Sequence, residues 1–319
     1  VIVVDKRVTI QVKDDYGNIN DKYDTVDITP NDNLYSKIGK EYGLFGEATA
    51  DITFKGKELN YLRYKISTTP TISNDGEWEE ATVKNVGELG TVSAKLPQEA
   101  GTYYITYEAA NSSNKQNVKA AGVYGPFVVS DRFDLNRVIK AVDDNSSNDE
   151  LYEITYTVKP NDIKFTDIFR SQEEIDKFIE EGTVPNTLDV ININVVENLP
   201  DSLIAIYPVN GSGQLTIPVN NIVYTLDTTG EPKDWKYTAS EVKVTLKVKL
   251  NPNVDVGDSI VLEDNVAKLT YSDIKVNDKD RQSRVQFFNG AKLEGLLSSV
   301  ITKQGLLTQN KVQNGTATT

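Results

Sequence analysis

The segment Val195-Val196-Glu197-Asn198-Leu199-Pro200-Asp201-Ser202-Leu203 places a carboxyl group on what should be the apolar side of a β-strand. Side chains alternate between the two faces of a strand, so Glu197 shares its face with Val195 and Leu199. The proline that follows is a break, because it has no backbone N–H to give to a neighbouring strand. The segment therefore predicts a strand that buries one acid among apolar side chains.

Short β-patterned runs, separated by turn-forming residues, recur on both sides of this segment. In the first part of the chain the expected strands are 1–13, 23–28, 47–54, 59–67, 81–86, 91–96, 102–109 and 122–130. In the second part they are 136–142, 151–159, 189–196, 203–207, 214–217, 222–226, 241–250, 265–272 and 283–288. Many short strands at fairly regular spacing are typical of a β-sandwich.

The spacing of the strands predicts an all-β fold with two immunoglobulin-like β-sandwich domains, residues 1–130 and 131–295. The run Gly-Thr-Tyr-Tyr-Ile-Thr-Tyr at 101–107 resembles the penultimate strand of such a domain. Residues 296–319 are expected to be either a plain tail or a strand that pairs with an open sheet edge of another subunit. The N-terminal residues 1–12 are an equally good donor strand.

One short helix is expected to interrupt the second domain. Ser171 and Glu174 fit a capping box, and Ile175 and Phe178 begin an apolar stripe that ends before Gly182. We expect this helix to pack on the edge of the sandwich.

Composition narrows the classes of function. The 319 residues include no cysteine and no histidine, so disulfides, thiolate chemistry and the usual general base near neutral pH are excluded. The net charge of −13 without basic clusters argues against nucleic acid and anionic membranes as partners. Methionine is absent even at position 1, which predicts a processed, exported protein. No apolar run approaches the length of a membrane span.

Two other polar residues fall, like Glu197, on the apolar face of a predicted strand. Lys140 has the parity of Val138 and Val142. Asn265 likewise has the parity of the apolar positions in its own strand. If these strands face one core, a lysine, a carboxyl group and an asparagine all point inward, where each must be satisfied or neutralised. The plainer interpretation, that the three are ordinary surface or strand-edge residues, stays open.

These segments resemble the isopeptide-forming domains of Gram-positive pilins and adhesins over roughly residues 134–290. The resemblance lies in a lysine in the first strand, the V-x-acid-x-L-P-x-x-L segment at 195–203, and N-x-A-x-L-x-Y at 265–271. The run YEITYTVKP at 152–160 resembles their second strand. The chain departs from the pattern by using glutamate where aspartate is commoner, by the extra residues 161–188, and by having no Leu-Pro-x-Thr-Gly motif.

The resemblance implies a covalent crosslink built from Lys140, Glu197 and Asn265. Burial would keep the Lys140 amine neutral and nucleophilic, and would keep the Glu197 carboxyl group protonated. The amine would attack the Asn265 carboxamide, and ammonia would leave. A weaker pair of the same kind, Lys6 and Asn117, lies in the first domain without an acid between them.

The resemblance and the composition together predict a structural subunit of a bacterial extracellular fibre, pilus or surface layer, and not an enzyme. Such a subunit would polymerise through its terminal strands. The alternative is a stalk or ligand-binding module of a surface adhesin, with a host or matrix ligand. No cofactor is expected. The acidic loops at 143–150 and 273–280 could offer oxygen ligands to calcium, but they lack the regular spacing of a calcium loop, and solvated turns are the favoured interpretation.

Overall fold

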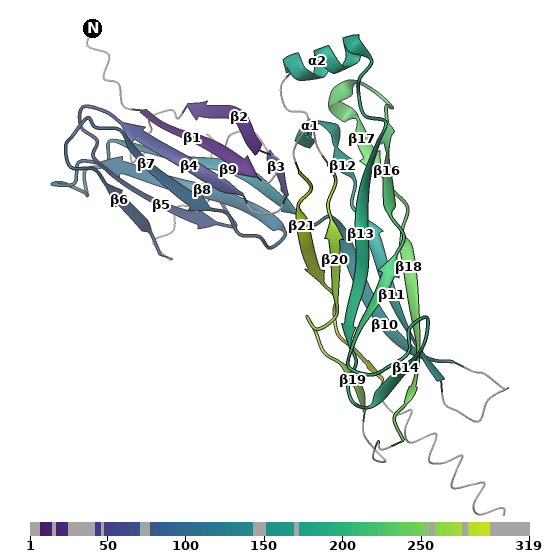
Figure 1. Ribbon diagram of the computed structural model, residues 1–319. Coiled ribbons are helices and arrows are strands. Elements are labelled where there is room, and N and C mark those ends of the chain that lie inside the picture. The colour runs from purple at the N-terminus through teal and green to yellow at the C-terminus, as the bar shows by residue number, and fades with distance from the viewer. Residues whose placement is uncertain are drawn as a thin grey trace, which may run out of the picture.

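The computed structural model describes residues 7–14, 17–24, 42–45, 48–70, 77–142, 151–168, 172–252, 254, 259–275 and 280–293. Within these residues the chain is built almost entirely of antiparallel β-strands, with two short α-helices (Figure 1). The prediction of an all-β fold with a short helical insertion is therefore confirmed.

The first part of the chain forms two sheets. One has the strand order β2-β1-β4-β7 and the other β3-β9-β8-β5-β6. The strands are β1 (Arg7–Asp14), β2 (Gly17–Asp24), β3 (Tyr42–Phe45), β4 (Thr49–Lys55), β5 (Tyr61–Ser67), β6 (Glu79–Thr82), β7 (Gly90–Lys95), β8 (Gly101–Ala110) and β9 (Ala120–Ser130). Buried and more exposed side chains alternate along these strands, as predicted. In β1, Val8, Ile10 and Val12 are buried, while the residues between them are half-buried.

The second part of the chain also forms two main sheets. One has the order β10-β11-β18-β14, the other has the order β12-β17-β16-β13-β20-β21 with β15 paired to β13, and β19 pairs with β22 separately. The strands are β10 (Phe133–Val142), β11 (Leu151–Pro160), β12 (Ile163–Lys164), β13 (Thr187–Asn198), β14 (Leu203–Tyr207), β15 (Gln214–Val219), β16 (Ile222–Asp227), β17 (Lys236–Thr238), β18 (Val242–Leu250), β19 (Ile260–Leu262), β20 (Lys268–Ser272), β21 (Ser283–Phe287) and β22 (Ala291–Leu293).

The predicted helix is present as α2 (Gln172–Glu181), and it is followed by Gly182, whose φ of 62° is the left-handed conformation that favours glycine. Ile175 is buried and Phe178 packs partly against the core, whereas Ile179 is exposed. The proposed cap Ser171 lies outside the described residues. A second helix, α1 (Phe165–Ile168), and a 3-10 turn, η2 (Pro232–Asp234), were not predicted.

Several strands differ from the prediction. The segment 14–21 was expected to be a turn, but β2 begins at Gly17 and pairs with β1. Strands β3, β12, β17, β19 and β22 were not predicted, because each has only two to four residues and too few side chains to show an alternation. β3 also pairs in parallel with β9, a long-range contact that local sequence does not encode.

The buried hydrophobic residues form two large clusters with no residue in common. The first extends from Val8 to Val129 and the second from Phe133 to Phe288. Their limits lie on either side of residue 130, near which the sequence predicts a domain boundary. The second cluster surrounds the Glu197 carboxylate, which makes it the part of the fold that positions the candidate site.

Candidate functional site

The structure places the three residues of the predicted crosslink in different environments. Glu197 is fully buried on β13 between Val195 and Leu199, as predicted. Lys140 is exposed, on the face of β10 opposite the buried Arg137 and Ile139. Asn265 is exposed in a turn, with a φ of 60°, three residues before β20 begins. The inward orientation predicted for Lys140 and Asn265 is therefore wrong.

The parity arguments failed for two separate reasons. Within residues 138–142, apolar side chains alternate on the face of β10 that carries Lys140. The longer run from Phe133 through Arg137 to Ile139 lies on the opposite face, and this is the face that packs on the core. The turn before β20 has a left-handed residue, which breaks the alternation, so the parity of β20 does not extend back to Asn265. Lys140 lies in register with Glu153 of the neighbouring strand β11.

Arg137 is the cation that pairs with Glu197. Its Nη1 donates to both carboxylate oxygens, at 3.0 Å to Oε1 and 2.8 Å to Oε2, and both side chains have no exposed surface. Its Nε donates to the Asn289 carbonyl oxygen at 2.9 Å and its Nη2 to the Glu263 carbonyl oxygen at 2.6 Å. One guanidinium group thus contacts β13 and the segments that precede β20 and follow β21.

The Glu197 carboxylate accepts two further hydrogen bonds. The Tyr156 hydroxyl group donates to Oε2 at 2.6 Å, and the Asn198 backbone N–H donates to Oε1 at 3.0 Å. Burial, followed by the nearby Glu197 charge, raises the pKa of Tyr156 far above its ordinary value, so the hydroxyl group remains a donor. Both charges are paired and hydrogen-bonded, which is the condition under which a buried ion pair is tolerated.

The chemistry of this pair differs from that of a crosslink. A guanidinium group stays protonated at any ordinary pH and has no free amine lone pair, so Arg137 does not act as a nucleophile toward a carboxamide. The arrangement joins β10, β11 and β13 by charge-assisted hydrogen bonds instead of an amide bond. We call Arg137, Glu197, Tyr156 and Asn289 the ionic clamp.

Two side-chain amides pair with the backbone of β10 in place of a strand. β10 is an edge strand in its sheet. Gln286 accepts from the Phe133 N–H at 3.2 Å and donates to the Phe133 carbonyl oxygen at 2.8 Å. Asn289 does the same at Arg137, with distances of 2.9 Å and 3.0 Å. The two main sheets of the second sandwich are therefore linked along this edge by side chains.

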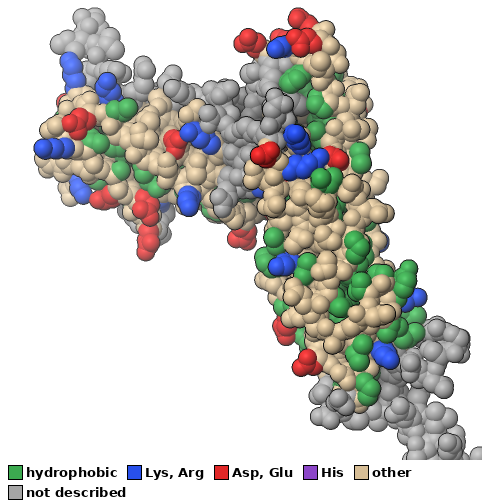
Figure 2. Space-filling model, viewed as in Figure 1, with side chains coloured by type: hydrophobic (Ala, Val, Ile, Leu, Met, Phe, Trp, Pro, Cys, Tyr) green, Lys and Arg blue, Asp and Glu red, His purple; other side chains and the backbone are tan. Residues whose placement is uncertain are grey.

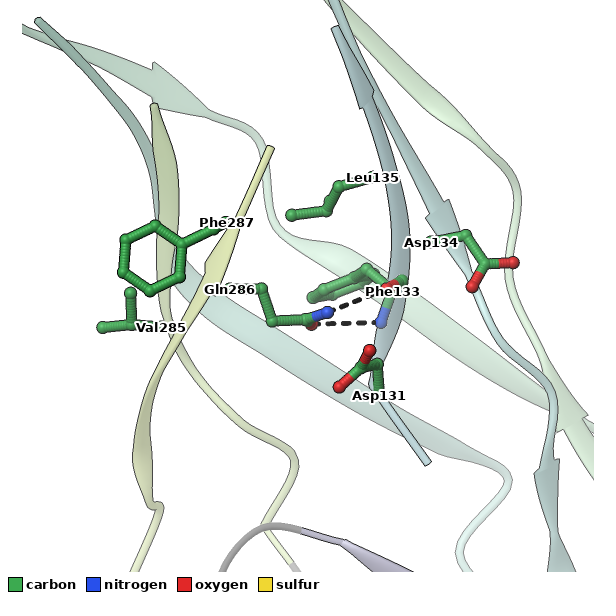
Figure 3. Close-up of a pocket in the computed structure, with 7 residues that line it drawn as sticks. All are labelled: Asp131, Phe133, Asp134, Leu135, Val285, Gln286 and Phe287. Carbon is green, nitrogen blue, oxygen red and sulfur yellow. Dashed lines mark hydrogen bonds between the residues drawn. The ribbon is translucent and has the colours of Figure 1, made fainter. Parts of the chain in front are cut away.

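A groove of about 390 Å³ lies between β10 and β21 at this edge, and Gln286 crosses it (Figure 3). Leu135 points toward β21, whereas Val285 and Phe287 project from the other face of β21 (Figure 3). Alternate residues of a strand turn their backbone N–H and C=O to the same side, so Leu135 presents these groups to the same side as Phe133 and Arg137. Among the described strands, none pairs with β10 on this side.

A second buried ionic cluster surrounds Asp273. Arg132 Nε donates to Oδ1 at 2.8 Å and Arg284 Nε donates to Oδ2 at 2.5 Å. The Ile274 N–H donates to Oδ1 at 2.8 Å. Because its oxygens face two arginines, Asp273 is not available as a calcium ligand, which removes the first acid of the 273–280 loop from that interpretation. The other candidate calcium loop, 143–150, lies outside the described residues, as does Lys6.

Sequence reasoning missed Arg137, Tyr156 and Asn289. A signal for Arg137 was present, since it shares the parity of Phe133, Leu135 and Ile139, and a charged residue within a longer apolar alternation is the stronger candidate for burial. No local signal points to Asn289, because it lies in an irregular segment and reaches β10 only through the tertiary fold.

The fold and the clamp define an all-β protein of sandwich type in which a buried ion pair links β10 to β13. No protein-family model matches the chain, and comparison with curated protein sequences finds none that is similar. Within the described segments, no helix is both long and apolar enough to cross a membrane.

The positions of Lys140 and Asn265 give a direct prediction about covalent structure. Both are exposed while Glu197 is buried against Arg137, so we expect no amide to form between them. Intact-mass spectrometry of the purified chain should give the full mass calculated from the sequence. A chain lighter by one ammonia, with a Lys140–Asn265 crosslinked peptide after digestion, would contradict this expectation.

Proposed function

We propose that this chain is a structural subunit of an extracellular fibre, pilus or surface layer of a bacterium, and that copies associate by strand addition or end-to-end packing. The observation that carries the proposal is the ionic clamp together with the Gln286 amide. They fasten β10, the first strand of the second sandwich, to the segments around β21 near its end. The proposal includes no catalysis and no cofactor.

The clamp supports a mechanical role because of where it acts. A load applied at residues 130 and 293 pulls on β10 and β22, the first and last strands of the second sandwich. Separating β10 from the segments around β21 requires the Arg137, Gln286 and Asn289 contacts to break. It also separates the buried Glu197 carboxylate from the buried Arg137 guanidinium group, which leaves each charge without its partner. A fibre subunit needs this resistance, whereas a freely diffusing enzyme or carrier does not.

The surface also suits association between copies. Large hydrophobic side chains with more than half of their surface exposed include Leu89, Tyr207, Val223 and Phe287. Figure 2 shows hydrophobic side chains gathered on the lower part of the second sandwich, with few charges between them. A contiguous exposed apolar surface is suited to binding another protein.

Electron microscopy of the purified full chain across a range of concentrations tests the proposal. Filaments or sheets that appear as the concentration rises are expected. Removal of residues 1–6 or 296–319 should reduce them. Neither deletion removes a residue of the described buried core, whereas deletion of residues 1–12 would remove Val8, Ile10 and Val12 from it. A chain that stays monomeric at every concentration contradicts the proposal, and retention of this monomer by a host protein or glycan would identify an adhesin stalk instead.

A further inference from the structure

At the free edge of β10, side-chain carboxamides form the hydrogen bonds that a neighbouring strand would form. At Phe133 and at Arg137 the backbone N–H and C=O are each paired by one carboxamide, from Gln286 and Asn289 respectively. A carboxamide carries one acceptor and one donor side by side, so it reproduces the pairing of a peptide group. Leu135 lies between these two positions on the same side, and it faces the groove. The edge therefore has two filled positions and one that opens into a cavity.

The acidic residues at the rim of the groove favour a positively charged occupant. Asp131 and Asp134 both line the groove and both are exposed, and the Asp134 carboxylate also accepts a hydrogen bond from the Asn161 amide at 3.1 Å. Burial, followed by the nearby Asp134 and Glu99 charges, raises the pKa of Asp131. Val285 and Phe287, half exposed, also line the groove, but they project from the face of β21 opposite Gln286 (Figure 3). A suitable occupant combines carboxamides, apolar side chains and positive charge.

One segment of the chain itself has this composition. Residues 303–314 read Lys-Gln-Gly-Leu-Leu-Thr-Gln-Asn-Lys-Val-Gln-Asn, with five carboxamides, two lysines and no acid. This contrasts with a chain whose net charge is −13. The described chain ends in β22, which pairs with β19 at the end of the second sandwich farthest from the first, whereas Asp131 directly follows β9 (Figure 1). The described residues therefore end away from Asp131, which is compatible with end-to-end stacking of copies.

We propose that the groove between β10 and β21 binds residues 303–314 of a second copy of this chain, with a carboxamide of that segment pairing with the Leu135 backbone. This inference rests on the proposed self-association and identifies the groove as the surface that binds the C-terminal segment of the second copy. Lys303 and Lys311 lie against Asp131 and Asp134, and the leucines of the segment cover Val285 and Phe287.

Charge reversal in the full chain tests the proposal by sedimentation velocity. The groove variant Asp131→Lys/Asp134→Lys and the tail variant Lys303→Glu/Lys311→Glu should each weaken self-association at least about tenfold. A chain that carries all four substitutions should recover association to within about threefold of the unchanged protein, because the attraction is restored with the signs exchanged. The exposed acids of Asp201→Lys/Glu241→Lys provide a control with the same change in net charge, and this variant should associate as the unchanged chain does.

A backbone variant examines the open position itself. Leu135→Pro removes the N–H that faces the groove, and proline is tolerated on edge strands where that N–H has no strand partner. Weaker association at an unchanged melting temperature is expected. If the variant fails to fold, the charge-reversal set still decides the question.

The outcomes separate the two proposals. Self-association that is unaffected by the groove and tail reversals overturns the groove as acceptor and leaves the proposed function standing. Loss of association in both reversals without recovery in the fourfold variant also overturns direct pairing of the two. An unchanged chain that remains monomeric at all concentrations overturns the proposed function, and the acceptor assignment with it.

Discussion

Replacing Glu197 with glutamine is expected to lower the free energy of unfolding by about 3–5 kcal/mol, the usual cost of leaving one partner of a buried ion pair without the other. Glutamine keeps the size of the side chain and an acceptor for the Tyr156 hydroxyl group, so the loss isolates the charge. The Arg137 guanidinium group would remain fully buried with only neutral acceptors, namely the Asn289 and Glu263 carbonyl oxygens and the new amide oxygen. Chemical denaturation followed by tryptophan fluorescence and circular dichroism measures the change.

Two companion variants make the Glu197 experiment decisive. Lys140→Gln removes a charge from the exposed face of the same strand that carries Arg137, so its effect should stay within about 0.5 kcal/mol. The double variant Arg137→Met/Glu197→Gln removes both charges and should recover part of the loss, because it leaves no buried charge without a partner. A loss below about 1 kcal/mol for Glu197→Gln alone would show that the clamp does not hold the second sandwich together.

Asp273→Asn is expected to cost a similar amount, about 3–5 kcal/mol, because two arginines lose the same buried anion. Arg132 is only 2% exposed and cannot turn to solvent without opening the chain between β9 and β10. The Tyr224 hydroxyl group and the Asn161 N–H both bind the Arg132 carbonyl oxygen, at 3.3 Å and 3.0 Å, so this segment is held by several contacts at once. Thermal unfolding by differential scanning calorimetry tests the expectation.

The matched control for Asp273 is Asp189→Asn. Asp189 pairs with Arg281 at 2.5 Å, but 45% of its side chain is exposed, so solvent screens the pair and its loss should cost about 0–1 kcal/mol. Equal losses in the two variants would contradict the view that burial, and not the number of ion pairs, determines the stability of this region.

Much of the fold could be predicted from local sequence. Strands with five or more residues and a clear alternation, such as β11 and β15, lie where period-two patterning placed them. The helix α2 was found from its apolar stripe and the glycine that ends it. Short strands such as β12 and β22 were missed, because their pairing is decided by distant partners and not by their own two or three residues.

The candidate site was predicted only in part. Glu197 was found because an acid within an apolar alternation is a strong local signal. Its partner was misassigned, because β10 carries apolar residues on both faces and sequence alone does not show which face meets the core. Asn265 was misplaced because the alternation of β20 was extended through a turn.

By itself, the sequence determined that this chain is β-rich, lacks thiol and imidazole chemistry, and buries a carboxylate at Glu197. Those properties follow from residue type and from a period of two, which are local. Only the tertiary structure decided that the carboxylate meets Arg137 and not Lys140, and that Asn289 and Gln286 complete the edge of β10. The physical reason is that a charge is buried only where a partner from another strand reaches it, and sheet packing sets which face of that strand points inward.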